Sequence, residues 1–177
     1  MQQPLVDSPT PKSSLGHTAV ITLILFAPVL ALNWFTQTKG LRLHEGPEIK
    51  LAVYSLTVYF MVWYFIMARQ GTSRNIVNAE LLKSPDAIEP AIKAWFHNID
   101  RSFLNMQEQS VMFLASFLLY SLYVSPNVGA YIGYAYSFLT AIYPAMHPSP
   151  IMFVSTVPRY WIIFYMMTGS LVAAMRS

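Results

Sequence analysis

Apolar residues are concentrated in five stretches of the chain, separated by polar segments. The stretches are Thr18–Phe35, Leu51–Ala68, Ser110–Val124 with a polar lead-in, Val128–Met146 and Ile151–Met175. Each is close to the roughly 20 residues that a helix needs to cross a bilayer. Runs such as "LAVYSLTVYFMVWYFIMA" are apolar on every face and do not alternate, which argues against membrane-spanning strands. The pattern predicts an all-α integral membrane protein.

The segments between these stretches predict how the helices are connected. The longest, Arg69–Asp100, contains helical pieces interrupted by prolines and is expected to lie along the membrane surface. The connections at 125–127 and 147–150 are short and contain proline, so the final three helices should form an antiparallel up-down bundle. The predicted parts are a polar tail (1–17), an N-terminal span (18–35) and a helical membrane domain (50–177).

Composition agrees with a membrane protein and excludes several kinds of site. Hydrophobic residues make up 55% of the chain and charged residues only 11%, with a mean hydropathy of +0.42. A net charge of +3, dispersed along the sequence, does not suggest nucleic acid as a partner. There is no cysteine, and no two of the four histidines have metal-ligand spacing, so no metal site is predicted.

Polar residues lead directly into the third apolar stretch, in "DRSFLNMQEQSVMFLASFLLYSLYV". Arg101, Asn105 and Glu108 are spaced i, i+4 and i+7, which places them within about 60° on one helix face. An ionised Glu108 inside a membrane requires a partner or a polar cavity. The stripe could join helices within a bundle, or its cation and carboxylate could hold the two ends of a small zwitterionic ligand.

The motif "RSFLNMQE" resembles the Arg-x-x-x-Asn-x-x-Glu signature of the MAPEG family, the membrane-associated proteins of eicosanoid and glutathione metabolism. It is followed by "LLYSL", a helix ending in Tyr143, and the pair Pro148 and Pro150, in the order found in microsomal glutathione transferases. The resemblance covers about Lys50–Met175 and leaves 18–35 as an additional transmembrane helix. It implies an antiparallel four-helix bundle made of Leu51–Ala68, Ile99–Val124, Val128–Met146 and Ile151–Met175.

The resemblance also implies a ligand. Family members are typically homotrimers that bind glutathione between subunits, which would make Arg101, Asn105 and Glu108 the glutathione-binding residues. The family's transferases use a further arginine in the third helix to stabilise the glutathione thiolate, and the corresponding residue here is Tyr136. A tyrosine hydroxyl can donate one hydrogen bond to a thiolate but supplies no positive charge.

Arg159 is the remaining cation within the apolar stretches, and an intramembrane charge is a candidate functional group. Three roles are open for it: an ion pair with Glu108 across the bundle, a relocated catalytic arginine, or a contact to a lipid headgroup or another subunit. We favour the ion pair, in which the carboxylate would be occupied without any ligand.

Two functions follow from these residues. The favoured one is a catalytically degenerate MAPEG-like protein that serves as an accessory subunit of a larger membrane complex, in contact with membrane lipids and other membrane subunits. The alternative is an active, homotrimeric microsomal glutathione transferase or peroxidase acting on hydrophobic electrophiles or lipid peroxides. In either case we expect an intracellular membrane, either the mitochondrial inner membrane or the endoplasmic reticulum.

Overall fold

The computed structural model describes residues 28, 31–35, 46–83, 90–147 and 149–177. This part of the chain contains four long helices and no strand, so the all-α prediction is confirmed for it. The helices are α2 (Lys50–Lys83), α3 (Pro90–Tyr123), α4 (Pro126–Met146) and α5 (Met152–Met175), and the short 3₁₀-helix η1 (Gly46–Ile49) precedes them. The described residues 31–35 are also helical.

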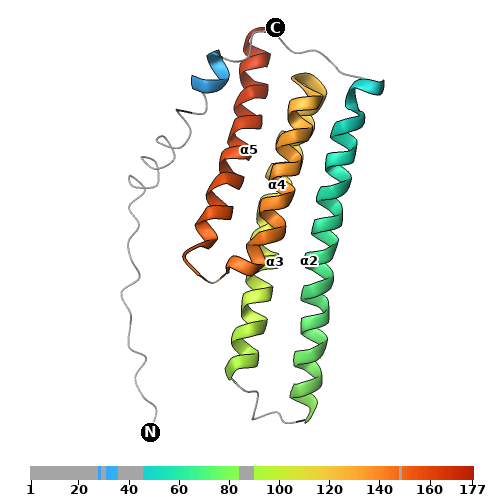
Figure 1. Ribbon diagram of the computed structural model, residues 1–177, viewed down its shortest axis with the longest axis vertical. Coiled ribbons are helices and arrows are strands. Elements are labelled where there is room, and N and C mark those ends of the chain that lie inside the picture. Colours follow the sequence, from blue (N-terminus) through green and yellow to red (C-terminus); the bar gives the residue numbers. More distant parts are fainter. Residues whose placement is uncertain (1–27, 29–30, 36–45, 84–89, 148) are drawn as a thin grey trace.

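The four long helices form an antiparallel up-down bundle (Figure 1). The helices α3 and α4 pack against each other, and each also contacts both α2 and α5. The α3–α4 pair therefore lies between α2 and α5, which are diagonally opposite each other in the bundle. The predicted antiparallel arrangement of the final three helices is confirmed, because their connecting turns are too short to allow any other.

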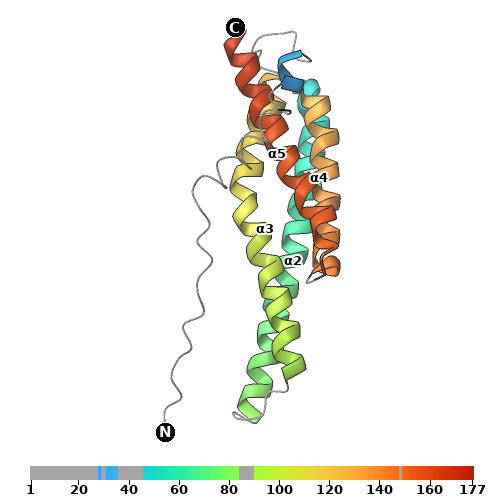
Figure 2. The ribbon, with the colours of Figure 1, turned by 90° about the vertical axis from the view of Figure 1, so that its left-hand side faces the viewer.

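The helices α2 and α3 extend beyond the end of the bundle as a two-helix hairpin, visible in both ribbon views (Figures 1 and 2). Each has 34 residues, or about 51 Å of helix. The prediction that Arg69–Asp100 lies along the membrane surface is therefore wrong, since most of this segment continues the two helices. Polar residues alone do not end a helix; a lone glycine such as Gly71 costs only about 1 kcal/mol, and Pro90 is tolerated at the first helical position.

The turn before α4 carries its own stop and start signals. Ser125 is extended (φ −160°, ψ 107°), and its hydroxyl accepts a hydrogen bond from the backbone N–H of Val128 at 3.4 Å. Pro126 occupies the first helical position, where the missing N–H is not needed. This N-cap reverses the chain within two residues, which brings α4 alongside α3.

The core of the bundle is rich in aromatic rings. Fully buried rings come from α2, α3 and α4, and they are Tyr59, Phe113, Phe117, Tyr120 and Tyr136. The rings of Phe113 and Tyr136 stack face to face with centroids 3.8 Å apart. Gly133 lets α4 come close to this cluster, because a Cβ there would lie 2.6 Å from the ring of Phe117. Close backbone approach and ring stacking thus fix the rotation of α4.

One helix in the described part of the chain, within Lys50–Ala79, is long and apolar enough to cross a membrane, with a mean hydropathy of 1.7. Only 22% of its most apolar window is buried inside the bundle. Large apolar side chains are therefore exposed along α2, among them Val53, Tyr54, Met61, Tyr64 and Phe65. This agrees with a membrane-associated protein, whereas the count of five spans remains a prediction.

The described residues 31–35 pack against α5. Asn33 is fully buried, and its Nδ2 donates to the backbone oxygen of Tyr165 at 3.1 Å and to the hydroxyl of Thr168 at 2.7 Å. The guanidinium of Arg176 lies 5.0 Å from the centre of the Trp34 ring and donates to the backbone oxygen of Trp34. Most of the predicted N-terminal span 18–35 and all of the tail 1–17 lie outside the described residues.

Candidate functional site

The three residues of the predicted stripe lie on α3, but their environments differ. Arg101 and Glu108 are exposed, whereas Asn105 is half-buried and faces α5. The amide oxygen of Asn105 accepts a hydrogen bond from Nη2 of Arg159 at 3.1 Å. The stripe therefore divides into an outward-facing pair of charges and one residue that belongs to the core.

Arg159 is completely buried, with 0% of its surface exposed. Its hydrogen bond to Asn105 joins α5 to α3, and its guanidinium carbon lies 4.6 Å from the centre of the Tyr143 ring on α4. Nε and Nη1 have no hydrogen-bond partner among the described residues. A buried guanidinium held by one amide and one ring is an incompletely matched charge.

The predicted ion pair between Arg159 and Glu108 is wrong, because the partner of Arg159 in the described structure is the neutral side chain of Asn105. Glu108 lies three residues after Asn105, which turns it about 60° further around the helix. That rotation leaves its carboxylate exposed. Its carboxylate therefore does not belong to the buried polar contacts around Arg159.

Tyr136, the residue at the position expected for the family's arginine, is buried in the core with 1% exposed. Its ring stacks on Phe113 at an interplanar angle of 6°. Its hydroxyl donates to Oε1 of Gln109 at 3.4 Å, and Nε2 of Gln109 lies 3.5 Å from the amide oxygen of Asn105. The tyrosine hydroxyl is therefore directed into the protein.

These contacts form a buried polar chain, defined here as Arg159, Asn105, Gln109 and Tyr136, which links α5, α3 and α4. Three of its members, Arg159, Asn105 and Tyr136, were candidate residues from the sequence pattern, whereas Gln109 was not. The available signal was its spacing: Gln109 follows Asn105 by four residues and so lies on the same face of α3.

A second hydrogen bond connects α2 to the same region of α3. The hydroxyl of Tyr59 donates to the hydroxyl of Ser110 at 2.7 Å, and that hydroxyl donates to the backbone oxygen of Met106 at 2.8 Å. The rings of Tyr59 and Tyr136 lie 5.9 Å apart. All four long helices therefore meet in one polar and aromatic layer next to the predicted site.

A small cavity of about 140 Å³ opens beside the polar chain, between α3 and α5. Its lining residues are Glu108, Gln109, Met112, Tyr160, Ile163 and Phe164. Sites for small ligands usually measure about 300–1,000 Å³. A single chain in this conformation therefore does not enclose a tripeptide at Glu108.

Arg101 lies near the end of α4. Burial of the imidazole lowers the pKa of His147, and the positive charge of Arg101 lowers it further. Nδ1 of His147 is buried and has no partner among the described residues. His147 is therefore neutral at neutral pH.

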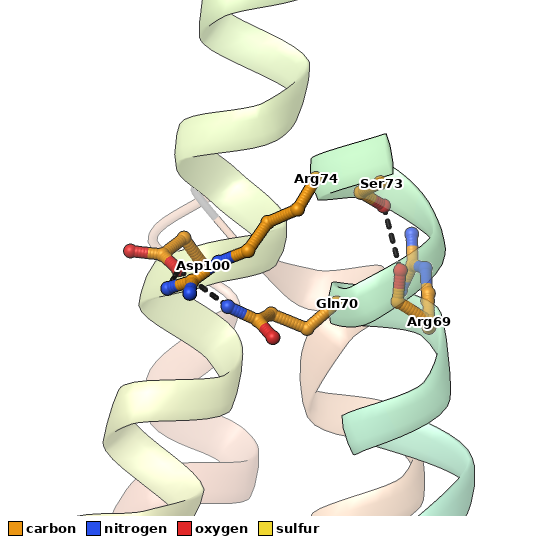
Figure 3. Close-up of polar contacts among 5 residues, drawn as sticks. All are labelled: Arg69, Gln70, Ser73, Arg74 and Asp100. Carbon is orange, nitrogen blue, oxygen red and sulfur yellow. Dashed lines mark hydrogen bonds and ion pairs between the residues drawn. The ribbon is translucent and has the colours of Figure 1, made fainter. Parts of the chain in front are cut away.

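The hairpin formed by α2 and α3 is held by a polar contact that sequence analysis did not identify (Figure 3). Oδ1 of Asp100 accepts hydrogen bonds from Nε2 of Gln70 at 2.9 Å and from Nη2 of Arg74 at 3.3 Å. The Gln70 hydrogen bond is the main cause that lowers the pKa of Asp100. Burial opposes it, and the hydrogen bond and charge of Arg74 lower the pKa further. The residues in this layer serve to join two helices.

The described residues contain no group of three or more histidines and carboxylates that could hold a metal ion. Comparisons with protein-family models, with curated proteins and with solved structures found no match. The resemblance of "RSFLNMQE" to the MAPEG signature therefore remains a prediction.

Proposed function

We propose that this protein is a catalytically degenerate, MAPEG-like membrane protein that serves as a structural or accessory subunit of a larger membrane complex. The observation that carries the proposal is the buried polar chain. Two of its residues already have partners inside the protein: Asn105, which by the resemblance would bind glutathione, and Tyr136, which is at the position of the catalytic arginine.

Glutathione binding through Asn105 would have to compete with Arg159. Releasing Asn105 would remove the hydrogen bond to a fully buried guanidinium, at a cost of about 1.5–3 kcal/mol. Tyr136 is similarly committed, since its ring is stacked and its hydroxyl is directed to Gln109. A thiolate bound at the exposed side of α3 would receive no hydrogen bond from it without repacking of the core.

The surface of α2 supports a place among lipids and other membrane subunits. Its exposed apolar side chains, such as Met61 (66%) and Phe65 (69%), require a nonaqueous environment or a protein partner. A helix that exposes this much apolar surface is typical of a membrane or of an assembly. The intracellular membrane that we propose, mitochondrial inner membrane or endoplasmic reticulum, provides both.

One observation favours the alternative, an active glutathione transferase. Arg101 and Glu108 remain exposed on one face of α3, where a ligand held between two subunits could reach both. Arg101 would bind the carboxylate of glutathione, and Glu108 its amine. Because this arrangement requires a homotrimer, the particle mass separates the two functions.

The test is glutathione binding by isothermal titration calorimetry, with the protein purified in mild detergent and the particle mass measured in parallel. Arg101→Ala probes the predicted site, and Arg69→Ala is the matched control because it removes an exposed arginine from the hairpin. We expect no binding in any of the three proteins, and a particle larger than a homotrimer. Binding that Arg101→Ala abolishes and Arg69→Ala preserves, in a homotrimer, would overturn the proposal in favour of the transferase.

A further inference from the structure

An apolar groove of about 340 Å³ runs between α3 and α5 at the end of the bundle where the chain terminates. It is lined by Leu119, Tyr123, Met167, Ser170, Leu171 and Ala174. The hydroxyl of Ser170 already donates to the backbone oxygen of Met166 at 2.9 Å. The wall of the groove is therefore apolar, and the hydroxyl of Ser170 needs no hydrogen bond from a ligand.

The groove and the residues beyond it up to Arg176 together span about the depth of one leaflet of a bilayer. From Met167 at its inner end to Arg176 beyond its outer end, the helical rise is about 14 Å. Half of a bilayer's hydrocarbon core is about 15 Å. Tyr123 and Trp34 lie at the same outer end, as is typical of aromatic residues at the level of the headgroups.

The outer end also carries a positive charge. Arg176 is exposed, and it uses one side-chain nitrogen for the backbone oxygen of Trp34. A guanidinium has five N–H donors, so this bond leaves donors for an anion. The planar fork of a guanidinium matches the oxygens of a phosphate bidentately, as it does those of a carboxylate.

The shape and chemistry of the groove limit what can occupy it. A helix is about 10–12 Å across with its side chains, which is too wide for a groove of this volume between two packed helices. An extended peptide would leave backbone groups without hydrogen bonds against an apolar wall. A hydrocarbon chain needs no polar partner and can follow the curvature of the helices.

We infer that this groove is a phospholipid-binding site, which holds one acyl chain between α3 and α5 and the lipid phosphate at Arg176. The inference rests on the membrane location in the proposed function, and it does not depend on the loss of catalysis. It gives the protein a bound lipid at its surface, between α3 and α5.

The experiment is native mass spectrometry of the full-length protein, extracted from membranes in mild detergent, with lipid adducts measured on each variant. Ala174→Phe fills the groove, and Ala115→Phe is the matched control because Ala115 is also an exposed helical alanine but does not line the groove. Arg176→Gln removes the charge. Thermal unfolding of each variant establishes that it is folded.

We expect the wild-type protein and Ala115→Phe to carry an adduct with the mass of a phospholipid. Ala174→Phe and Arg176→Gln should each lower its occupancy about tenfold, as for the loss of one charge-assisted hydrogen bond or of a few buried methylenes. Equal adducts on Ala174→Phe and Ala115→Phe, or an adduct with the mass of a free fatty acid, would overturn the inference.

Membrane extraction separates this inference from the proposed function. If the protein resists carbonate extraction from membranes but the groove variants carry the same lipid adducts as the wild type, only the lipid site is wrong. A protein that dissolves without detergent would contradict both the site and the membrane location.

Discussion

Replacement of Arg159 by methionine tests whether the buried guanidinium is a structural group without a matching anion. Arg159 is fully buried, makes one hydrogen bond of 3.1 Å to Asn105, and leaves Nε and Nη1 without partners in the described structure. Methionine keeps an unbranched side chain that can fill the same space. The substitution therefore removes the charge with little loss of packing.

The energy terms oppose each other, and the buried charge decides the outcome. The variant loses a hydrogen bond to a charged group, about 1.5–3 kcal/mol, and a contact of the cation with the Tyr143 ring, up to about 2 kcal/mol. It also removes a desolvation penalty of several kcal/mol and two unpaired donors, about 1–3 kcal/mol each. We expect the free energy of unfolding to stay the same or to rise by up to about 3 kcal/mol.

The assay is reversible unfolding in mild detergent, combined with Asn105→Ala in a double-mutant cycle. Alone, Asn105→Ala should destabilise the protein by about 2–3 kcal/mol, because it strands the buried guanidinium. In the Arg159→Met background the same change should cost less than about 1 kcal/mol, since that charge is gone. The matched control is Arg74→Met, whose side chain is 59% exposed and whose loss should change stability by less than about 1 kcal/mol.

A loss of more than about 2 kcal/mol in Arg159→Met, with no coupling to Asn105, would refute this reasoning. It would mean that the charge of Arg159 is matched by an anion outside the described chain.

Three further predictions follow. The lowered pKa of Asp100 means that its contacts stabilise the hairpin above the unfolded pKa of about 3.9, and that this contribution is lost as pH falls through the lower folded pKa. The protection factors of the hairpin amides, which correct the exchange rate for its intrinsic pH dependence, should therefore fall in acid, and Asp100→Asn should abolish that fall. Gly169→Ala should destabilise the protein by about 1–3 kcal/mol in thermal unfolding, because the new Cβ would lie 2.6 Å from an aromatic ring atom. The matched control Gly71→Ala should stabilise it by up to about 1 kcal/mol, because nothing lies within 4 Å of a Cβ at that position. Tyr136→Arg should lower stability by more than about 3 kcal/mol, since the site is buried, and should not create activity in a glutathione conjugation assay; a stable, active variant would contradict the degenerate reading.

The helices were largely predictable because their signals are local. Apolar runs predicted α4 and α5 nearly to their ends, but only the first half of α2 and the last part of α3, and the proline-containing turns predicted the antiparallel order of the final three helices. The prediction failed where it used polarity to end a helix at Arg69. Polarity decides which surface faces water, whereas the end of a helix depends on local stop and start signals such as the Ser125 cap and Pro126 before α4. The hairpin beyond the bundle follows from that distinction.

The spacing of Arg101, Asn105 and Glu108 determined by itself that they share one face of one helix. The tertiary structure decided which of them faces the core and which partner it meets. Asn105 and Arg159 are 54 residues apart, and their contact depends on the rotation of α5 against α3. That rotation is held by the close approach of Gly169 on α5 to the ring of Tyr120 on α3. Charge complementarity favoured Glu108 as the partner, but a rotation of about 60° keeps that carboxylate in the open. Local sequence determines which residues share a face of a helix, and only packing determines which way that face is turned.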